Sequence, residues 1–454
     1  MSAAQSLAVV VLAAGKSTRM KSNRSKVLHP VAGVPLISHV LAAVKPLKPA
    51  RTIVVVGPDG GEVARTVAPL PTAIQVNRLG TADAVRAARS QLKGFAGDVL
   101  VIYGDSPFLT TETLKKMVRR RRSGKTKPSV VVLGFRPDDP ARYGRLVLDK
   151  DGGLDRIVEW AEASEAERKI GFCNSGVMVI DGKRLSGFLD RVSNKNAKGE
   201  FYLTDLVGIA RKQGLAAAAI EAPADELLGI DSRANLADAE RLMQQRLRAR
   251  AMDEGATLVA PETIFLSADT RIGRDVTIHP HVVFGPGVTV ADRTEIRSFS
   301  HIEGTVIGEA AIVGPFARLR PGTRVGAGAH IGNFVELKAT SLGAGAKANH
   351  LAYLGDASVG AKANIGAGTI TCNYDGISKY QTEIGAGAFT GTNSTLVAPI
   401  RLGAGAYVTA GSVITEDVES DAMAFGRSRQ VVKPGRAREF RAARLAEKEA
   451  KKKA

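Results

Sequence analysis

The sequence predicts two domains of different classes: an α/β domain with a mixed, mainly parallel sheet, and a parallel β-helix of six-residue repeats, joined by a helix. Two observations lead to this prediction. Short apolar runs alternate with helical patterns over the first 231 residues, whereas apolar residues recur at every sixth position from Arg271 onward. A chain of 454 residues is also longer than one ordinary domain.

The first domain, residues 1–231, contains apolar runs that we interpret as buried strands. These runs are Leu7–Leu12, Thr52–Val56, Asp98–Tyr103, Ser129–Phe135 and Cys173–Ile180. Helical patterns such as Thr81–Leu92 and Thr111–Arg122 lie between them, as in α/β proteins. Ligands of such sheets bind at the carboxyl ends of the strands, so we expect the site in the loops that follow these runs.

A charged helical segment, residues 232–252, is expected to link the two domains. Leu236, Met243 and Leu247 share one face of this helix, and Ser232 is placed to cap its N-terminus. The linker prediction therefore rests on an amphipathic pattern with a recognisable start.

The second domain, residues 253–424, is predicted from the six-residue period. Its apolar positions include Ile272, Ile278, Phe284, Val290, Ile296, Ile302, Val313, Leu319, Val325, Ile331, Leu337, Ile384, Leu396, Leu402, Val408 and Ile414. A helix needs a spacing near 3.6 and a hairpin a spacing of 2, so this period indicates a prism-like β-helix. Small residues follow many apolar positions, and we expect them at tight corners. The segment Thr371–Glu383 interrupts the period as a loop.

The net charge of +18 concentrates in a basic tail, residues 425–454, and in a cluster that comprises Arg119–Arg122, Lys125 and Lys127. Neither segment is interleaved with the aromatic residues that stack on bases, so a solvated surface that attracts small anions is favoured over a nucleic-acid partner. Two distant cysteines fit a reducing compartment without disulfides. No apolar run is long enough to cross a membrane, so we predict a cytoplasmic protein without membrane insertion.

The loop Leu12–Met20 directly follows the first predicted strand. It matches neither the G-x-G-x-x-G pattern nor a Walker A loop. Its small residues allow close backbone approach, and Lys16 and Arg19 supply two cations, so it can cradle a triphosphate. Taken alone, the loop is also compatible with a plain strand–turn–helix junction.

Together with Lys26, this loop resembles the phosphate loop of the sugar-nucleotidyltransferase family. The resemblance extends to Gln75, Gly80-Thr81, Tyr103-Gly104-Asp105, Tyr143-Gly144-Arg145, Val158-Glu159 and Asn174-Ser175-Gly176. It implies a substrate site that includes Leu12, Ala13, Ala14, Gly15 and Lys26. In that site Gln75, Gly80 and Thr81 would read uracil and Gly104 would contact the nucleoside, while Gly144, Glu159 and Asn174 would hold the sugar.

Nucleotidyl transfer to a sugar phosphate requires charge neutralisation more than covalent catalysis. Lys16, together with the predicted catalytic residues Arg19 and Lys26, can spread positive charge along the phosphates of UTP. Asp105 stands at a strand end and is the expected Mg²⁺ ligand, with Asp231 as the second ligand. The best-known relatives carry Asn at position 231, so Asp231 adds a negative charge there; the alternative is a role only at the start of the linker helix.

Five segments of the second domain contain charged, polar and aromatic residues that a β-helix does not need for its own packing. They are Ala317–Gly322, Gly332–Lys338, Asn349–Asp356, Asn364–Thr369 and Cys372–Gly376. These segments resemble the acetyltransferase half of the bacterial bifunctional N-acetylglucosamine-1-phosphate uridylyltransferase/glucosamine-1-phosphate acetyltransferase family, and with the first domain the resemblance covers almost the whole chain. It implies that acetyl-CoA acetylates glucosamine 1-phosphate. UTP then converts N-acetylglucosamine 1-phosphate into UDP-N-acetylglucosamine, a precursor of peptidoglycan and lipopolysaccharide.

Acetyl transfer to an amine requires a base, and histidine is the side chain best suited to accept a proton near neutral pH. A lone histidine on a β-helix is usually only a surface residue, but the resemblance makes His350 the base and we expect Glu336 to orient it. Further implied roles are sugar-phosphate binding by Arg320, Lys338 and Tyr353, completion of the pocket by Asn364, Asn373 and Tyr374, oxyanion stabilisation by the N–H of Ala367, and acetyl-CoA binding by Ala367, Thr392, Ala410 and Arg427. The resemblance also implies a left-handed β-helix and a homotrimer with acetyl sites between subunits.

Three other interpretations remain open at this point. One is a single-activity sugar nucleotidyltransferase with a purely structural β-helix, and another is a noncatalytic assembly subunit with similar domains, such as those of a eukaryotic translation-initiation exchange factor. The third is a nucleic-acid-binding protein that uses the basic tail. The intact phosphate loop and the set of His350, Lys338 and Arg320 argue against the first two.

Overall fold

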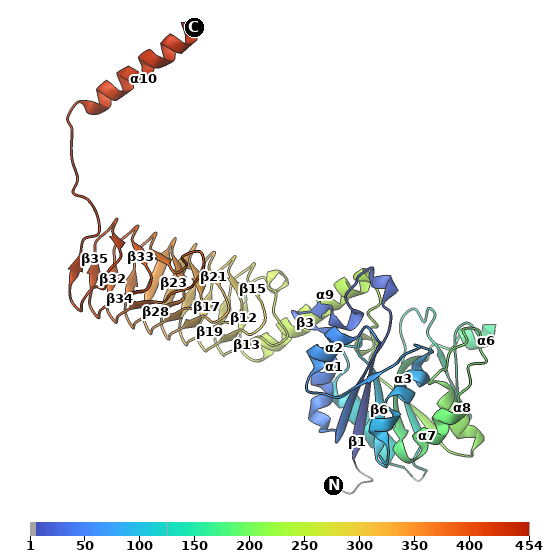
Figure 1. The fold of residues 1–454 in the computed structure, drawn as a ribbon. Helices are drawn as coiled ribbons and strands as arrows, with labels where there is room; N and C mark the ends of the chain where they lie inside the picture. The colour runs from blue at the N-terminus through green and yellow to red at the C-terminus, as the bar shows by residue number, and fades with distance from the viewer. Residues whose placement is uncertain (1–5, 125, 454) are drawn as a thin grey trace. The chain divides into compact units, whose positions relative to one another are not determined.

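The computed structural model describes residues 6–124 and 126–453, so Lys125 of the basic cluster lies outside the described residues. The chain divides into two compact units (Figure 1). The first unit comprises the residues up to Arg250 together with Phe265–Asp269, and the second comprises Ala251–Ile264 and the residues from Thr270 onward.

The first unit is built on one large sheet with the strand order β11-β7-β10-β6-β1-β4-β5. The bounds are β1 Leu7–Ala13, β4 Arg51–Val56, β5 Thr72–Ile74, β6 Asp98–Tyr103, β7 Val130–Phe135, β10 Cys173–Asp181 and β11 Ala217–Glu221. Along this path β10 alone runs antiparallel to its neighbours, as the described residues pair. A hairpin of β8 Arg145–Leu148 and β9 Leu154–Val158 joins the sheet through β10, and β2 Pro30–Val31 pairs with β3 Val34–Pro35 apart from it. The mixed, mainly parallel sheet is therefore confirmed.

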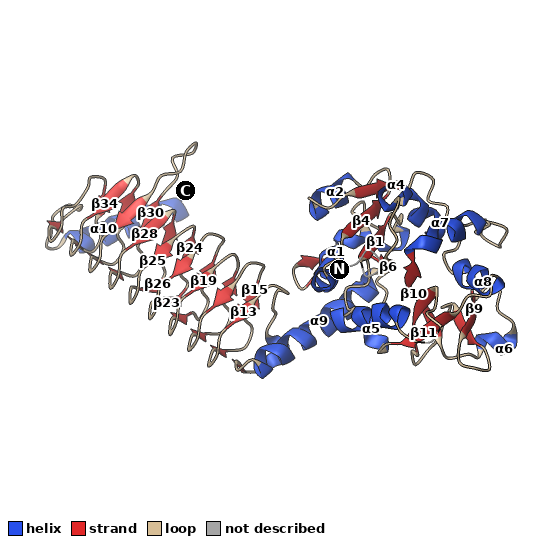
Figure 2. Ribbon diagram, turned by 90° about the horizontal axis from the view of Figure 1, so that it is seen from below, coloured by secondary structure: helices blue, strands red, loops and turns tan. Residues whose placement is uncertain are grey.

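Helices cover both faces of this sheet (Figure 2). Their bounds are α1 Leu36–Val44, α2 Gly61–Val67, α3 Thr81–Ala87, α4 Arg89–Leu92, α5 Thr111–Arg122, α6 Glu165–Arg168, α7 Gly182–Arg191 and α8 Asp205–Lys212. Alternate residues of β1 enter opposite cores: Val10 packs with Val85 of α3, whereas Val9 packs with Leu114 of α5. The segment expected as one helix over Thr81–Leu92 is two short helices that meet at Ala88.

The linker helix forms as α9, Arg233–Asp253, and Ser232 caps it by accepting a hydrogen bond from the Asn235 N–H at 3.2 Å. Most of α9 belongs to the first unit. The buried Gln244 side chain donates to the Leu266 carbonyl at 2.7 Å and accepts from the Leu266 N–H at 2.9 Å. These bonds attach the segment Phe265–Asp269 to the first unit. The chain therefore enters the second unit, returns to the first over these residues and enters the second again. The sequence does not predict this return.

The second unit is a parallel β-helix in which every coil adds one short strand to each of three sheets. The first sheet contains β12 Thr257–Leu258, β14 Thr277–Ile278, β17 Glu295–Ile296, β20 Ile312–Val313, β23 His330–Asn333, β26 Lys347–His350, β29 Asn364–Ile365, β32 Phe389–Thr390, β35 Tyr407–Val408 and β37 Met423–Ala424. The second contains β13 Arg271–Ile272, β16 Thr289–Val290, β19 Val306–Ile307, β22 Arg324–Val325, β25 Ser341–Leu342, β28 Ala357–Val359, β31 Thr382–Ile384 and β34 Ile400–Leu402. The third contains β15 Val283–Phe284, β18 His301–Ile302, β21 Arg318–Leu319, β24 Glu336–Lys338, β27 Tyr353–Gly355, β30 Ile370–Cys372, β33 Thr395–Val397 and β36 Val413–Ile414.

The predicted apolar positions point into this prism and stack in columns. Ile278, Ile296, Val313 and Ile331 are each fully buried, while Ile272 near the first coil is only partly buried. A second buried position lies two residues earlier in each rung and is held by small residues, among them Ala311, Ala317, Thr323, Ala329, Thr340 and Ala346. The hydrophobic period does not reveal this second column because many of its members are polar.

The small residues after the apolar positions have a different cause from the one predicted. Gly326 does not adopt a left-handed conformation, and a Cβ on it would lie 2.6 Å from the Ala344 nitrogen of the next coil. Left-handed positions in the second unit are occupied both by glycines such as Gly328 and Gly345 and by larger residues such as Phe299, Phe316 and Phe334, with φ between 56° and 62° for the three phenylalanines. At Gly326 glycine is therefore required by the close approach of successive coils and not by corner geometry.

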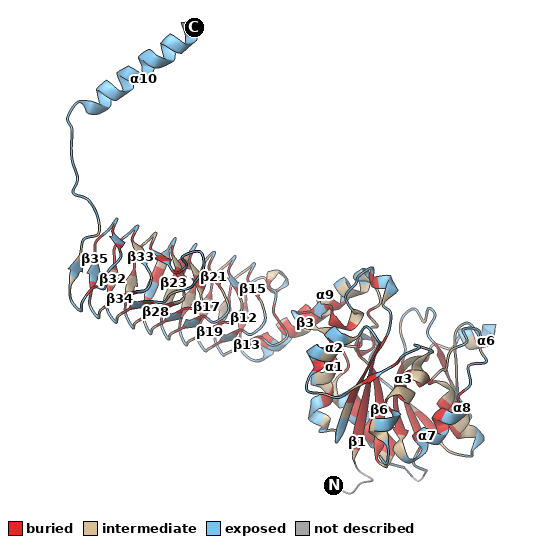
Figure 3. Ribbon diagram, in the orientation of Figure 1, coloured by how far each residue is buried: buried red, intermediate tan, exposed pale blue. Residues whose placement is uncertain are grey.

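The basic tail contains one helix, α10, Arg436–Lys453, which is exposed wherever its side chains are described (Figure 3). Across the described residues, no helix combines the length and apolar character needed to span a membrane. The predicted loop at Thr371–Glu383 begins and ends in β30 and β31, and a bridge between Tyr374 and Lys379 closes it.

Candidate active sites

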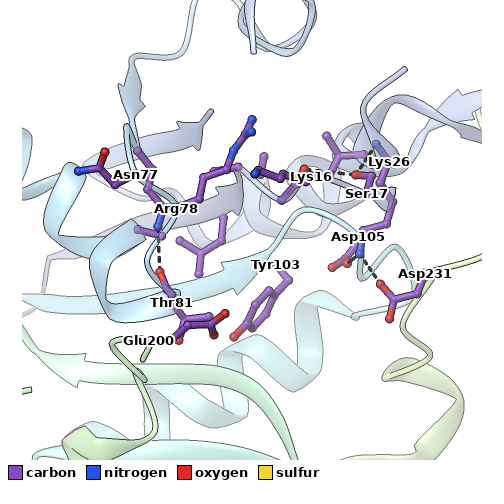
Figure 4. Close-up of a pocket in the computed structure, with 18 residues that line it drawn as sticks. Lys16, Ser17, Lys26, Asn77, Arg78, Thr81, Tyr103, Asp105, Glu200 and Asp231 are labelled. Atoms are coloured by element: carbon purple, nitrogen blue, oxygen red, sulfur yellow. Dashed lines mark hydrogen bonds and ion pairs between the residues drawn. The ribbon is translucent and has the colours of Figure 1, made fainter. Parts of the chain in front are cut away.

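A cavity of about 610 Å³ lies at the carboxyl ends of β1 and β6, where the topology of the first unit predicted a ligand (Figure 4). Its lining comprises Leu12, Ala13, Ala14, Gly15, Lys16, Ser17, Lys26, Val27, Gln75, Asn77, Arg78, Gly80, Thr81, Ala84, Tyr103, Asp105, Glu200 and Asp231. Ten residues predicted to bind substrate or metal are thereby brought to one cavity: Leu12, Ala13, Ala14, Gly15, Lys26, Gln75, Gly80, Thr81, Asp105 and Asp231.

The phosphate loop leaves β1 and turns at Ser17, which has a φ of 54°. This left-handed conformation is unfavourable for a residue with a Cβ. The Ser17 hydroxyl offsets part of the cost by donating to the Gly15 carbonyl at 3.3 Å and accepting from the Lys26 backbone N–H at 3.1 Å. Ser17 therefore ties the loop to the segment that carries Lys26.

Two cations and two carboxylates form a chain of ion pairs, an ion-pair quartet, in which Lys26, Asp105 and Asp231 line the cavity and Arg19 lies outside its lining. Lys26 Nζ contacts a carboxylate oxygen of Asp105 and lies 2.6 Å from Oδ1 of Asp231. Arg19 lies 2.9 Å from the other oxygen, Oδ2, of Asp231. Burial lowers the pKa of Lys26, but the carboxylates of Asp105 and Asp231 outweigh this effect and leave its pKa raised.

The donor set of the quartet fits a magnesium ion. Mg²⁺ is commonly held by one or two carboxylates together with substrate phosphates and water, and Asp105 and Asp231 converge on one atom. Within the described part of the chain, no cluster of three or more His, Cys, Asp or Glu side chains could hold a metal by itself. A Mg²⁺ held by Asp105 and Asp231 would complete its coordination with water or substrate oxygens.

Gln75 and Gly80, which were predicted to read uracil, also line this cavity. The Gln75 amide nitrogen donates to the Gly80 carbonyl at 2.9 Å and to Asp83 at 2.8 Å. With both amide hydrogens engaged, the side-chain oxygen of Gln75 is the atom left to accept a hydrogen bond from a ligand. Gly80 has a φ of 108°, and a Cβ there would lie 2.6 Å from the Phe201 carbonyl oxygen, so only glycine fits.

The residues predicted to hold the sugar gather beside the cavity rather than in its lining. The Asn174 N–H donates to the Gly144 carbonyl at 2.8 Å, and a Cβ on Gly144 would lie 3.6 Å from a Glu159 carboxylate oxygen. Burial raises the pKa of Glu159, and a hydrogen bond from the Thr204 hydroxyl opposes the shift only in part. Gly104 is adjacent to the phosphate loop, since its N–H donates to the Leu12 carbonyl at 2.9 Å.

Tyr103 at the end of β6 also lines the cavity (Figure 4). Burial, together with the nearby Asp105 and Glu159, raises the pKa of its hydroxyl. Asn77, Arg78 and Glu200 also line the cavity, and sequence reasoning assigned them no role. They come from loops without a periodic pattern.

The predicted acetyl-transfer residues lie on successive coils of the second unit. Arg320 pairs with Glu336 at 3.0 Å, and Glu336 stands directly beside Tyr353 in the strand register. Lys338 pairs with Asp356 at 2.9 Å.

The Asn373 amide donates to the same carboxylate, Asp356, at 2.5 Å. Asp356, whose side chain is 19% exposed, therefore holds both Lys338 and Asn373 in place. The sequence alone assigned it no role of its own.

His350 is exposed at the end of β26, and its Nδ1 lies 2.8 Å from Oδ1 of Asn333 on the preceding coil. The ring contacts Asn333 and Glu336 pairs with Arg320, so the expected role of Glu336 at this ring, orienting it or stabilising its charge, stays a prediction. We assign the hydrogen to Nδ1, since an amide oxygen can only accept, which leaves Nε2 with a free lone pair.

The residues predicted to bind acetyl-CoA follow one corner of the prism. The Ala367 carbonyl accepts from the Asn393 N–H at 2.7 Å, and the Thr392 carbonyl accepts from the Gly411 N–H at 2.8 Å. Ala410 precedes Gly411, and a Cβ on Gly411 would lie 3.7 Å from the Arg427 side chain. Asn364 pairs with Phe389 in the strand register, and Tyr374 is exposed on the loop after β30.

The chain matches two domain families along its length. Residues 9–169 match the MobA-like NTP transferase domain, and residues 269–304 and 304–339 match the bacterial transferase hexapeptide (six repeats). Among the similar proteins, the bifunctional protein GlmU of Paramagnetospirillum magneticum is 56% identical over 446 residues, which cover 98% of this chain and 99% of that protein. The chain belongs to the bifunctional GlmU family.

Other GlmU proteins show the same correspondence. That of Xanthobacter autotrophicus is 56% identical over 97% of this chain and 98% of its own length, and that of Agrobacterium fabrum is 52% identical over 98% of both. The predicted family, the nucleotidyltransferase domain, the left-handed β-helix of hexapeptide repeats and the bifunctional transferase activity are thereby confirmed. The alternatives of a structural tail and of a noncatalytic subunit are excluded with them.

Proposed function

We propose that this GlmU-family protein acetylates glucosamine 1-phosphate with acetyl-CoA and then transfers uridylyl from UTP to the N-acetylglucosamine 1-phosphate formed, releasing pyrophosphate. The observation that carries the proposal is the presence of both residue sets in one chain. In the first unit the loop after β1, two carboxylates and Gln75 line one cavity, and the second unit carries His350, whose Nδ1 contacts Asn333, together with the ion-paired Arg320 and Lys338.

In the proposed acetyl transfer, Arg320 and Lys338 bind the sugar phosphate. His350 Nε2 accepts a proton from the glucosamine ammonium, and Asn333 keeps the other ring nitrogen protonated. The free amine then attacks the thioester carbonyl, the C–S bond breaks, and the thiolate of coenzyme A leaves and takes up a proton. The N–H of Ala367 is proposed to stabilise the oxyanion.

In the proposed uridylyl transfer, the sugar-phosphate oxygen attacks the α-phosphorus of UTP and pyrophosphate departs on the opposite side. Gly144, Glu159 and Asn174 position the sugar, and the Gln75 oxygen accepts from the N3–H of uracil, which cytosine lacks. Lys26, Arg19 and Lys16 neutralise the phosphates. Asp105 and Asp231 would hold Mg²⁺, which supplies further charge neutralisation when bound.

We also propose a homotrimer in which acetyl sites form between chains and acetyl-CoA runs along Ala367, Thr392, Ala410 and Arg427. Support comes from an exposed ladder of stacked rings, Phe299, Phe316 and Phe334, with ring centroids 4.9 and 5.1 Å apart and exposed fractions of 44–54%. Such an apolar ladder is typical of an interface. The two free cysteines fit a reducing cytoplasm.

The test follows free coenzyme A and pyrophosphate in one reaction with glucosamine 1-phosphate, acetyl-CoA, UTP and Mg²⁺. His350→Ala should lower coenzyme A release by about 10²–10⁴-fold, the usual contribution of a general base, and leave pyrophosphate release from supplied N-acetylglucosamine 1-phosphate unchanged. Asp105→Ala should do the reverse. If His350→Ala retains full acetyl transfer, the site assignment in the second unit is wrong.

A further inference from the structure

The ion-pair quartet of Arg19, Lys26, Asp105 and Asp231 has a formal charge of zero, and its members are arranged as a chain. Asp231 is the central link, because one of its oxygens binds Lys26 and the other binds Arg19. Lys26 in turn reaches Asp105. Both cations that would grip phosphates are therefore already occupied by carboxylates before a nucleotide arrives.

Solvent exposure differs among the members of the quartet, and it determines how strongly each ion pair is screened. The side chains of Lys26 and Asp105 are only 15% and 19% exposed, so solvent screens their charges less than at an open surface. Arg19 is far more exposed, at 72%, and can leave Asp231 with little desolvation cost. A triphosphate entering without a cation would meet two uncompensated carboxylates as soon as Lys26 and Arg19 turned toward it.

We propose that Asp231 makes nucleotide binding conditional on a divalent cation, mainly by holding the enclosed Lys26 away from a metal-free triphosphate, while its pairing with the exposed Arg19 contributes less. A divalent cation at Asp105 and Asp231 removes that competition, and both basic side chains are then free for the phosphates. The inference rests on the proposed function of the cavity and concerns its selection of metal-bound over free UTP. Asp231 acts here as a specificity-determining residue.

Linkage makes this proposal quantitative. The ratio of the UTP dissociation constants without and with the cation measures the coupling between metal and nucleotide. By linkage, UTP changes the dissociation constant of the metal by the same ratio.

Asp231→Asn removes one negative charge and keeps an oxygen ligand of the same shape. A charge a few Å from the phosphates at a partly screened site changes affinity by about tenfold, so the variant should bind metal-free UTP about tenfold more tightly.

The experiment is isothermal titration of the full-length protein with UTP, once in EDTA and once in MgCl₂. The coupling ratio should fall by about tenfold or more in Asp231→Asn and in a second variant, Asp231→Ala. Asp190→Asn is the matched control, because Asp190 forms an exposed pair with Arg89 elsewhere in the first unit, and its ratio should equal that of the wild type.

Three outcomes separate the possibilities. Tighter binding of metal-free UTP by both Asp231 variants supports the inference. Unchanged or weaker binding of metal-free UTP by folded variants, as judged from their thermal unfolding, overturns it. If the wild-type protein binds no UTP even with MgCl₂, the proposed function of the cavity fails instead.

Discussion

The nucleotide cavity of the first unit is enclosed by one chain, whereas the acetyl-transfer residues of the second unit lie on the outside of a prism. Helices cover both faces of the sheet in the first unit, so the loops at its strand ends converge on a hollow. The β-helix has its interior filled by columns such as Ile278, Ile296 and Val313. It can offer ligands only flat faces and corners.

This difference has a consequence for how each site excludes water. Lys26 and Asp105 are largely enclosed within their own chain, while His350 is exposed and its partner Asn333 lies on the same open face. In the proposed homotrimer a neighbouring chain would cover this open face and exclude water from the thioester. The comparison therefore sets a site formed within one chain against one that, in our proposal, the trimer completes.

The largest expected effect comes from dissociating the assembly. Dilution to a single chain should lower acetyl transfer by about a hundredfold or more, because substrate positioning is lost, and leave uridylyl transfer within about twofold. Specific activities of both reactions, measured across a dilution series with sedimentation to report the assembly state, test this. Full acetyl transfer by a single chain would remove the distinction between the two sites.

A smaller effect is expected from Asn333. Asn333→Ala should lower kcat for acetyl transfer roughly tenfold by freeing the ring of His350, a part of the 10²–10⁴ that a general base supplies. Glu336→Gln should instead raise KM for glucosamine 1-phosphate, because it releases Arg320 from its partner. Steady-state kinetics of the two variants decide between Asn333 and Glu336 as the residue that orients the base, and equal effects on kcat would contradict our assignment.

A partly buried carboxylate, Asp205, should make the free energy of unfolding of the first unit depend on pH. Burial, with the nearby Glu162 and Glu159 carboxylates, raises the pKa of Asp205 to about 6. The folded state therefore binds this proton more tightly than the unfolded state, and the carboxyl costs stability as pH rises from about 4 to above 6. Asp205→Asn should raise the free energy of unfolding by about 1 kcal/mol at pH 8, and the gain should vanish near pH 4.

Urea unfolding followed by the fluorescence of Trp160, the single tryptophan of the chain, reports on the first unit. The exposed Asp151→Asn serves as the control and should show no such pH dependence. A gain that persists unchanged at pH 4 would show that burial of charge at Asp205 is not its cause.

The smallest effect concerns the backbone of the phosphate loop. Ser17→Ala keeps the unfavourable left-handed conformation and loses both hydroxyl contacts, so KM for UTP should rise about threefold to fivefold, equivalent to a hydrogen bond of about 1 kcal/mol. Ser17→Gly also loses the hydroxyl but relieves the strain, so its KM should stay within about twofold of the wild type. A larger effect of glycine than of alanine would contradict this account.

Where the sequence predicted well, a strong physical pattern was present. The run Leu7–Leu12 is buried on both faces of its strand, and the six-residue period fixes which side chains enter the prism. The apolar period marks only the inward positions. The pairing of Asn333 with His350 lies on the outer face, where it depends on the strand register between coils.

Other parts of the sites follow no pattern that a single sequence displays. Arg78 and Glu200 enter the nucleotide cavity from irregular loops, and their positions depend on how those loops pack. The fastening of Phe265–Asp269 to the first unit depends on one buried amide, Gln244. Neither the loops nor this amide produces a periodic or compositional signal.

The close stacking of coils at Gly326 affects how the second unit can vary in length along its axis. A Cβ there would meet the next coil, so the coils cannot approach more closely, and the Gly326 N–H donates to the Leu342 carbonyl at 2.7 Å, which resists their separation. Distance along the prism therefore increases in steps of one coil, about 4.8 Å, and the extra residues between β30 and β31 form a loop. The separation of any two residues along the prism is therefore set by the number of coils between them, and Asn333 and His350 lie on adjacent coils.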